Sequence, residues 1–438
     1  MQYQPHEIVI VGGGAGGLEL ATRLARKLGK GKKANITLVD SSLTHLWKPL
    51  WHEAAAGTLL SNEDELNYIA HAYYNNFNFI FGKLDGLTRT NKQIFLAPIF
   101  DENSHEIIPR RTLHYDTLLI AIGSVTNDFG TPGAKEYCTF LDERIQAEHF
   151  QQQLLKKFLQ NQNQLQLQGF SQLTIAIVGG GATGVELAAE LHYAILQAAR
   201  YSRTQVNSQY KIKITLIEAA DRLLATLPEK VSHAILQQLQ KMEIEVYTGQ
   251  RVAEVSDRGL LTSTGLFIAA DLKVWAAGIK APEILCYLDG LSVNRLNQLV
   301  VKQTLQTTLD ENIFAFGDCA HCLQPNWKNH DVPPRAQAAQ QQAKLLVKTI
   351  LRRLKNQPPL PYIYRDHGSL ISLSRQNTVG NLMGVLQGSF FIEGKMARLV
   401  YLSLYKRHQI ALYGFWQVFL ITLANLLTRR VKPKLKLH

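Results

Sequence analysis

The chain contains the same glycine-rich segment twice, and this repeat limits its possible folds more than any other feature. The segments EIVIVGGGAGGLELA, from Glu7, and TIAIVGGGATGVELA, from Thr174, match at most positions and begin about 167 residues apart. Each is followed by a helix-like stretch and by a second apolar segment that ends in an acid, Asp40 in ANITLVD and Glu218 in IKITLIE. The sequence therefore predicts two copies of one β-α-β unit.

The repeat extends to whole domains. The stretch YDTLLIAIGS (Tyr115 to Ser124) predicts a buried strand that runs into a glycine turn, and DLKVWAAGI (Asp271 to Ile279) repeats it after the second copy. A further strand, NIFAFGDCA (Asn312 to Ala320), precedes a helix-like segment from about Pro334 to Leu354. At roughly 100 to 200 residues per domain, 438 residues predict two to four domains.

Polar segments mark the expected boundaries. Leu155 to Leu173 is rich in Gln and Asn and predicts a polar helix or linker, and Tyr201 to Tyr210 is a polar insert in the second unit. QPPLP, from Gln357, cannot continue a helix. We expect the first domain to comprise residues 1–145 and 296–355, the second domain residues 146–295, and a C-terminal region residues 356–438.

The first glycine cluster has the chemistry of a dinucleotide site. Gly12, Gly14 and Gly17 fit G-x-G-x-x-G, with Gly13 between them. One glycine forms the bend, one lets the backbone approach a pyrophosphate, and one lets the helix pack on the strand. The pyrophosphate accepts hydrogen bonds from free N–H groups at the helix N-terminus, and Asp40 can accept them from ribose hydroxyls.

The second copy supplies Gly179, Gly181, Gly184 and Glu218 in the same roles. A single motif could be a bare loop, but two copies in matched context predict two Rossmann-like dinucleotide-binding domains in an α/β fold. An acid where a 2′-phosphate would need a cation favours NAD over NADP. The spacing from Gly181 to Glu218 exceeds the usual twenty or so residues, which weakens the assignment of Glu218.

The chain resembles flavoproteins with two dinucleotide-binding domains, of the pyridine nucleotide-disulfide oxidoreductase type. Specifically, it resembles the type II NADH dehydrogenases, single-subunit NADH:quinone reductases of bacterial membranes, and most closely the enterobacterial-type members. The resemblance covers essentially the whole chain, through IVIVGGGAGGLE, HLWKPLWHE, YDTLLIAIGS, VGGGATGVELAAELH, WAAGIKAP, FAFGDCA, PPRAQAA and KPKLKLH.

That resemblance implies that the first unit binds one FAD and the second binds NADH as substrate. The residues it adds around the nucleotides are Gly123, Gly317 and Asp318 for FAD and Gly278 for NAD. Asp318 then lies on the ribityl and phosphate side of the flavin. The alternative role for Asp318 is to cap a following helix.

The resemblance also implies three catalytic residues. The family signature A-Q-x-A-x-Q, on the quinone side of the flavin, matches Gln337 and Gln341, which are four apart and share a helix face. Without the family, Gln340 to Gln342 predict an ordinary solvated face. Glu186 matches a glutamate near the nicotinamide and flavin, and it is also an acid in a first helical turn, where it complements the helix dipole.

Four scattered cysteines argue against a secreted disulfide framework. The stretch HLWKPLWHEAAAG, where flavin disulfide reductases carry redox cysteines, has none, which also argues against a sulfide:quinone reductase. Cys319 and Cys322 form C-x-x-C, and two thiols fall short of the four ligands of a structural zinc site. We expect structural thiols and no metal, with a copper-type site as the alternative.

The net charge of +12 is concentrated at the C-terminus. From Lys395 onward there are nine basic residues and no acid, while the rest is nearly neutral, which argues against a nucleic-acid-binding body. Gln409 to Thr428 is uncharged, with a narrow polar stripe of Gly414, Gln417, Thr422, Asn425 and Thr428. We expect a membrane-associating segment, an amphipathic helix on an anionic lipid surface, with a spanning helix or a buried or dimer-forming helix as alternatives.

These features predict an NADH:quinone oxidoreductase of the respiratory chain, peripheral on the cytoplasmic face of the bacterial inner membrane. Hydride passes from NADH to FAD, and two electrons then pass to ubiquinone or menaquinone without proton pumping. The N-terminus shows no export signal, and a homodimer is compatible with the sequence. The alternatives are a flavoprotein that reduces a soluble acceptor or a metal ion, and a redox-sensing protein that binds FAD and NADH.

Overall fold

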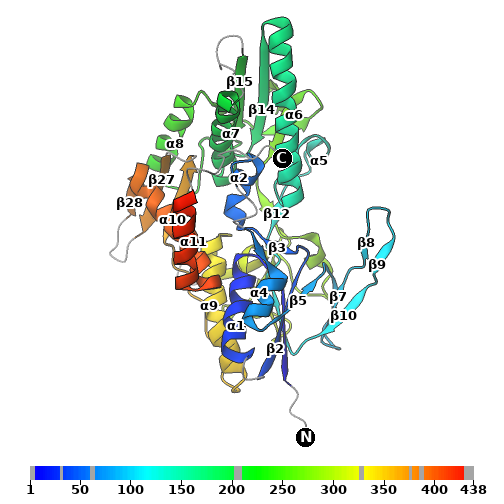
Figure 1. Ribbon diagram of the computed structural model, residues 1–438. Helices are drawn as coiled ribbons and strands as arrows, with labels where there is room; N and C mark the ends of the chain where they lie inside the picture. Colours follow the sequence, from blue (N-terminus) through cyan, green and yellow to red (C-terminus); the bar gives the residue numbers. More distant parts are fainter. Residues whose placement is uncertain are drawn as a thin grey trace. The chain divides into compact units, whose positions relative to one another are not determined.

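A computed structural model describes residues 5–29, 33–59, 65–201, 210–324, 330–373, 377–383 and 389–428 (Figure 1). The chain forms two compact units. Unit 1 comprises Met1–Lys48, Glu65–Val125 and Ile279–Arg365, and unit 2 comprises Pro49–Asp64, Thr126–Gly278 and Asp366–His438. Each unit is therefore assembled from three separate stretches of the chain.

Unit 1 is built on a five-stranded parallel sheet. Its strands, in spatial order, are β23 (Ile313–Ala315), β11 (Thr117–Ile120), β1 (His6–Val11), β2 (Ala34–Asp40) and β5 (Asn78–Phe81). The helices α1 (Ala15–Leu28) and α9 (Ala336–Arg353) lie side by side, and α4 (Tyr68–Asn75) packs on α1 and β5 (Figure 1). Helices cover the sheet, so its inner strands are almost continuously apolar.

Unit 2 repeats this sheet. Its parallel strands, in spatial order, are β13 (Thr139–Phe140), β20 (Leu272–Trp275), β14 (Ser171–Val178), β15 (Tyr210–Ile217) and β16 (Glu245–Tyr247). Its helices are α2 (Trp51–Ala55), α5 (Ala134–Tyr137), α6 (Arg144–Gln168), α7 (Ala182–Tyr201) and α8 (Glu229–Lys241). The predicted duplicated α/β fold is confirmed, and α6 shows that the Gln-rich stretch is largely a helix.

Short strands, most of them in antiparallel pairs, complete both units. Those of unit 1 are β3 (Thr44–His45), β4 (Leu66–Asn67), β6 (Leu84–Thr88), β7 (Gln93–Leu96), β8 (Ile99–Phe100), β9 (Glu106–Ile108), β10 (Arg111–His114), β22 (Leu299–Val301), β24 (Ala320–Gln324) and β25 (His330–Asp331). Those of unit 2 are β17 (Val252–Val255), β18 (Gly259–Thr262), β19 (Phe267–Ala269), β26 (Gly368–Leu373), β27 (Asn377–Met383) and β28 (Ser389–Glu393). The boundary strands are β12 (Val125–Thr126) and β21 (Ile279–Lys280). β22 runs parallel to β24.

The C-terminal part of unit 2 ends in two helices, α10 (Gly394–Tyr413) and α11 (Phe415–Thr428). The expectation of one helix across the uncharged stretch from Gln409 is wrong, because Gly414 adopts φ +92° and ends α10. A residue with a side chain rarely adopts that conformation. Within the described part of the chain, no helix is both long enough and apolar enough to cross a bilayer.

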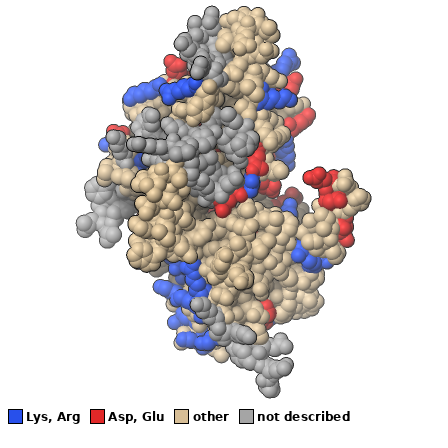
Figure 2. Space-filling view, in the orientation of Figure 1, with Lys and Arg blue, Asp and Glu red and all other residues tan. Residues whose placement is uncertain are grey.

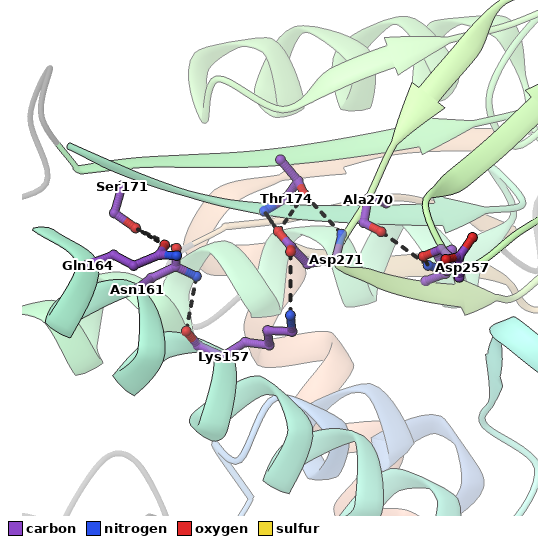
Figure 3. A network of polar contacts seen from close by, with 9 residues as sticks. Lys157, Asn161, Gln164, Ser171, Thr174, Asp257, Ala270 and Asp271 are labelled. Atoms are coloured by element: carbon purple, nitrogen blue, oxygen red, sulfur yellow. Dashed lines mark hydrogen bonds and ion pairs between the residues drawn. The ribbon is translucent and has the colours of Figure 1, made fainter. Parts of the chain in front are cut away.

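A polar network joins α6 to the central strands of unit 2 (Figure 3). The Thr174 hydroxyl donates to a carboxylate oxygen of Asp271 at 2.6 Å, and the Thr174 amide donates to the same oxygen at 3.0 Å. The ammonium group of Lys157 lies 3.6 Å from the other carboxylate oxygen. Nearby, the Ser171 hydroxyl donates to the side-chain oxygen of Asn161 at 2.5 Å. Two adjacent strands and one helix are thus fixed through a single carboxylate.

Replacing Thr174 by Val should lower the free energy of unfolding by about 1–2 kcal/mol, because the Asp271 carboxylate loses its shortest donor. Replacing Lys157 by Met should cost less than about 1 kcal/mol, because it removes only a half-exposed ion pair. Urea denaturation followed by circular dichroism measures both losses. Equal losses in the two variants would contradict the ranking of these contacts.

Candidate functional site

At two positions of the first glycine turn, Gly12 and Gly17, the surrounding backbone leaves no room for a side chain. Gly12 has φ +102°, and a Cβ there would overlap the backbone of Ala121. A Cβ on Gly17 would overlap the carbonyl oxygen of Gly12, so the first turn of α1 touches the end of β1. At Gly14, by contrast, a Cβ would meet no atom within 4 Å. The turn is therefore closed toward the sheet and open in front of the helix N-terminus.

The open side is suited to an anion. Gly14 is the N-cap of α1 and supplies no side-chain cap, and the first turn of α1 contains no acid. The first N–H groups of a helix have no partner within the helix and carry its positive dipole end. A pyrophosphate in front of Gly14 therefore fits the donors and the space that this turn provides.

Asp40 fixes the shape of the same turn. Its carboxylate accepts hydrogen bonds from the Gly13 amide at 2.5 Å and from the Ser42 amide at 2.8 Å. Burial raises the pKa of Asp40, and these backbone donors act in the opposite direction. The predicted contact of Asp40 with ribose hydroxyls stays a prediction, and the structure adds a role in holding the glycine backbone.

The second turn reproduces the first. Gly179 has φ +111°, a Cβ on Gly184 would overlap the Gly179 carbonyl oxygen, and the space at Gly181 is open. The Glu218 carboxylate accepts from the Gly180 amide at 2.6 Å and from the Ala220 amide at 2.7 Å. Glu218 thus makes the contacts that Asp40 makes in unit 1. Its longer spacing in sequence comes from the insert between α7 and β15, of which residues 202–209 lie outside the described residues.

Three more predicted residues gather at the carboxyl edge of the unit 1 sheet. Gly123 follows β11 and Gly317 follows β23, both with positive φ. The Ser124 hydroxyl donates to the Asp318 carboxylate at 2.9 Å. Asp318 lies in a 3-10 turn that leads into β24, so the alternative that it caps a following α-helix is wrong.

The helix α9 brings a run of glutamines to the same edge, beside Gly317. Gln342 is buried and its side-chain oxygen accepts from the Gly317 amide at 2.8 Å. Gln341 bonds the backbone of Arg365 twice, donating to its carbonyl at 2.7 Å and accepting from its amide at 3.1 Å. Gln337 lies half-buried in the first helical turn. Since Gln340 and Gln342 are buried, the solvated-face alternative for this glutamine run is wrong.

The sequence did not point to two residues of unit 1 that contact the predicted FAD-binding segments. The Tyr68 hydroxyl donates to the Gly13 carbonyl at 2.7 Å, and its ring occupies the space beside Gly13. The Lys48 ammonium group donates to the Ser124 carbonyl at 2.8 Å, next to Asp318. Lys48 lies in the family-like motif HLWKPLWHE, which could have drawn attention to it. No sequence motif pointed to Tyr68.

Glu186 lies in a buried polar cluster of unit 2, on α7 two residues after Gly184. Its carboxyl group accepts from the Ser372 amide at 2.9 Å, and the His52 imidazole lies 3.7 Å away, which is too far for a hydrogen bond. Burial is the largest cause that raises the pKa of Glu186, to about 8, and the charges of Glu53 and Glu190 add to it. Burial also lowers the pKa of His52 to about 4. At neutral pH, therefore, Glu186 is a protonated acid beside a neutral imidazole and not half of an ion pair.

Two further groups extend this cluster. One turn along α7, Glu190 accepts from the Thr58 hydroxyl at 2.5 Å. The Tyr401 hydroxyl on α10 is buried without a hydrogen-bond partner among the described residues. Burial and then the charges of Glu186, Glu53 and Glu190 raise the pKa of Tyr401 far above its usual range. Sequence patterns indicated Glu186 alone, because the members outside α7 come from three separate segments of the chain.

Gly278 is placed beside an aromatic side chain within unit 2. It has φ +67°, and a Cβ there would overlap the ring of Phe129. The Asn127 amide donates to its carbonyl at 3.3 Å. The strand-to-glycine pattern of β20 therefore ends in a crowded turn, whereas Gly123 in unit 1 leaves its Cβ position open.

The paired thiols are buried. The Cys319 thiol donates to the carbonyl oxygens of Phe316 and Ile120, at 3.3 Å and 3.6 Å. Burial raises the pKa of Cys319 to about 12 and that of Cys322 to about 11. Thiolates are the metal-binding and nucleophilic form, so this environment favours the interpretation as structural thiols.

Comparisons with known proteins agree with this geometry. A family model described as pyridine nucleotide-disulphide oxidoreductase matches residues 6–343. The chain is 44% identical to a type II NADH:quinone oxidoreductase of Haemophilus influenzae, over 98% of this chain and 99% of the relative. It is 26% identical to the protein of the same name from Staphylococcus aureus, over 86% of this chain and 90% of the relative.

Solved structures share the fold at lower identity. NDH2 from Plasmodium falciparum in complex with NADH superposes with a TM-score of 0.80 and 20% identity, covering 98% of this chain and 100% of that chain. A sulfide:quinone oxidoreductase from Aquifex aeolicus gives a TM-score of 0.72 and 18% identity, covering 93% and 92%. At these identities the structures establish the fold alone.

The pKa values of the Glu186 cluster predict how stability depends on pH. Above pH 6.5, where unfolded His52 is already neutral, the folded state keeps a proton on Glu186 until about pH 8, and the unfolded state does not. The free energy of unfolding should fall across this window by on the order of 1 kcal/mol per pH unit. Glu186→Gln should flatten this slope, as measured by urea denaturation at several pH values.

The matched control is Glu148→Gln, which neutralises a glutamate on α6 whose side chain is 38% exposed. This change should leave the slope of the wild type intact. If Glu186→Gln retained that slope as well, the protonated state assigned to Glu186 would be incorrect.

Proposed function

Since the chain belongs to the type II NADH:quinone oxidoreductases, within the pyridine nucleotide-disulphide oxidoreductase family, we propose that unit 1 holds FAD and unit 2 holds NADH. The reaction is the oxidation of NADH by a quinone in the respiratory chain, without proton pumping. The observation that carries the assignment is the identity of 44% over nearly the full length of both chains. Two matched glycine turns supply the two sites that this reaction needs.

FAD fits the carboxyl edge of the unit 1 sheet. The open space at Gly14 admits the pyrophosphate, and Asp40 lies where it can accept from ribose hydroxyls. Asp318 is held by Ser124 near Gly123, where a carboxylate can accept from ribityl hydroxyls. When bound, FAD supplies the redox chemistry, taking hydride from NADH and giving two electrons to the quinone.

NADH fits the corresponding edge of unit 2. The space at Gly181 admits its pyrophosphate, and the adjacent strand ends in Glu218. A carboxylate at that position accepts from a 2′-hydroxyl and repels a 2′-phosphate. Glu218 therefore supports selectivity for NADH over NADPH, and Gly278 completes the turn after β20.

The chain's own side chains have three proposed tasks in the reaction. Gln337 offers a neutral amide to a quinone carbonyl without fixing a charge. Gln341 has its amide bonded to the Arg365 backbone, so it shapes the segment beside α9. Glu186, on the nucleotide-binding helix of unit 2, is protonated at neutral pH and is the acid available near the nicotinamide.

We place the enzyme on a lipid surface, because respiratory quinones dissolve in the bilayer. Eight large apolar side chains of the fourteen-residue helix α11 are exposed, among them Trp416 and Leu427 at 74% and 73%. The hydroxyls of Thr422 and Thr428 donate to carbonyls of their own helix, which lowers the polarity of the stripe they belong to. An uncharged helix of this kind fits the interface between headgroups and acyl chains.

The flanking charges of this helix are described only in part. Lys406 and Arg407 lie on α10. The predicted cations after α11 (Arg429, Arg430, Lys432, Lys434 and Lys436) and the side chain of Lys395 lie outside the described residues. We propose attachment to the cytoplasmic face of the bacterial inner membrane, where NADH is available.

The purified, FAD-loaded protein should oxidise NADH rapidly with a short-chain quinone as acceptor. NADPH should be a poor donor, with kcat/KM lower by on the order of a hundredfold, since in the proposed site its 2′-phosphate would meet the carboxylate of Glu218. Stopped-flow absorbance of the flavin separates the two half-reactions. A flavin that NADH reduces and quinone fails to reoxidise would refute quinone reductase activity.

Changing Trp416, Leu420 and Leu427 to Ser should weaken binding to phospholipid vesicles at least tenfold, because each buried apolar side chain contributes roughly 1.5–3 kcal/mol. The control is Ile145→Ser, Leu159→Ser and Leu167→Ser on α6, which removes equally exposed apolar groups of the same unit. Vesicle flotation measures both. Retained flotation with loss of a dimer in sedimentation would instead identify α11 as a dimer contact.

A further inference from the structure

Three helices of unit 1 carry an uneven distribution of charge. α9 has four basic residues, Lys344, Lys348, Arg352 and Arg353, and no acid. α4 has no Lys, Arg, Asp or Glu. α1 adds three basic residues and one acid, which is buried and bonded to a basic residue of its own helix at 2.7 Å. Together the three helices have seven basic residues and one acid.

The basic residues of α9 form a stripe. Lys344, Lys348 and Arg352 follow one another at intervals of four, which places them on one helix face. Lys344 and Lys348 are exposed. α1 packs closely on α9, since a Cβ on Gly16 would lie only 3.1 Å from the Ala339 carbonyl oxygen. Figure 2 shows Lys and Arg side chains gathered in the lower part of the view, over the region where Figure 1 shows α9.

The helix α4 adds an aromatic patch to this layer. Ile69, Tyr73 and Tyr74 are 58%, 79% and 78% exposed on a helix of eight residues, and the two tyrosine rings meet edge to face at 5.4 Å. The Arg26 guanidinium at the end of α1 donates to the Asn75 side chain at 3.0 Å. This bond places the aromatic patch directly beside a cation of α1.

Exposed tyrosines next to lysines and arginines have the chemistry of a membrane interface. Tyrosine combines an apolar ring with a polar tip and prefers the headgroup level, and cations there attract anionic phosphates. A polyanion in water would gain nothing from Ile69 or from an uncharged helix. The substrate of the enzyme, a quinone, also requires access to lipid.

We propose that Ile69, Tyr73, Tyr74, Lys344 and Lys348 form a second lipid-binding surface, which docks unit 1 on anionic headgroups independently of α11. This proposal rests on the membrane association proposed above and extends it to the unit that holds FAD. The protein then has one lipid-binding surface in each unit. Binding then depends on anionic lipid through unit 1 and on apolar insertion through α11.

The test is flotation of the FAD-loaded, full-length protein with two kinds of vesicle, phosphatidylcholine alone and phosphatidylcholine mixed with phosphatidylglycerol. Lys344→Gln with Lys348→Gln should weaken binding to the anionic vesicles on the order of tenfold. Binding to the neutral vesicles should stay unchanged. NADH oxidation with a water-soluble quinone should match the wild type, which confirms that the variant is folded.

The charge control is Lys83→Gln with Arg295→Gln, which removes two exposed cations of unit 1 outside the three helices. It should change binding less than about twofold, since those cations belong to none of the three helices. A second experiment tests the aromatic residues by comparing Tyr74→Ser with the control Tyr287→Ser. Tyr287 is 69% exposed, lies in the same unit and bonds to Glu283. Only Tyr74→Ser should weaken flotation.

Two results would overturn the proposal while membrane association stands. One is equal binding of the Lys344 and Lys348 variant and its charge control to anionic vesicles. The other is loss of binding to duplex DNA in that variant with vesicle binding intact, which would identify a nucleic-acid surface. A wild-type protein that binds neither kind of vesicle would overturn this proposal and the membrane association together.

Discussion

The close contact between a helix and the strand before it governs both units. Gly17 touches the Gly12 carbonyl and Gly184 touches the Gly179 carbonyl, so the helix dipole begins directly above the end of the central strand. The acid at the end of the next strand then accepts a hydrogen bond from a backbone amide of the same turn: Asp40 from Gly13, and Glu218 from Gly180. One backbone arrangement thereby fixes the packing of the layer and the place where a pyrophosphate can bind.

The helix that starts at the second turn also carries Glu186. The acid is buried among Glu53, Glu190 and Tyr401, and its nearest basic group, His52, is neutral at physiological pH. A carboxyl group in such surroundings keeps its proton, which is the arrangement that general acids use. The second glycine turn and a carboxyl group with a raised pKa therefore belong to one helix of unit 2, through residues that lie close together in the sequence.

Much of the fold followed from patterns in the sequence, because parallel buried strands are continuous apolar runs and glycine turns have few alternatives. Where prediction was wrong, a local pattern was overridden by contacts. Gly414 divides an apolar run that has no other break, and Gln340 and Gln342 are polar yet buried, since Gln342 holds the turn at Gly317. The net charge of the chain outside the C-terminus did not indicate the basic stripe of α9, because acids elsewhere in the chain balance those cations.

The sequence by itself determined the two nucleotide turns and their acids, Asp40 and Glu218, because those contacts join residues within one β-α-β unit and leave a fixed spacing. It also determined the family, through motifs spread over the whole chain. Only the tertiary structure decided the partners of Glu186, the contacts of Tyr68 and Lys48, and the packing of α4 and α9 on α1. Those groups come from distant segments, and burial and the direction of a helix face are properties of the packed chain.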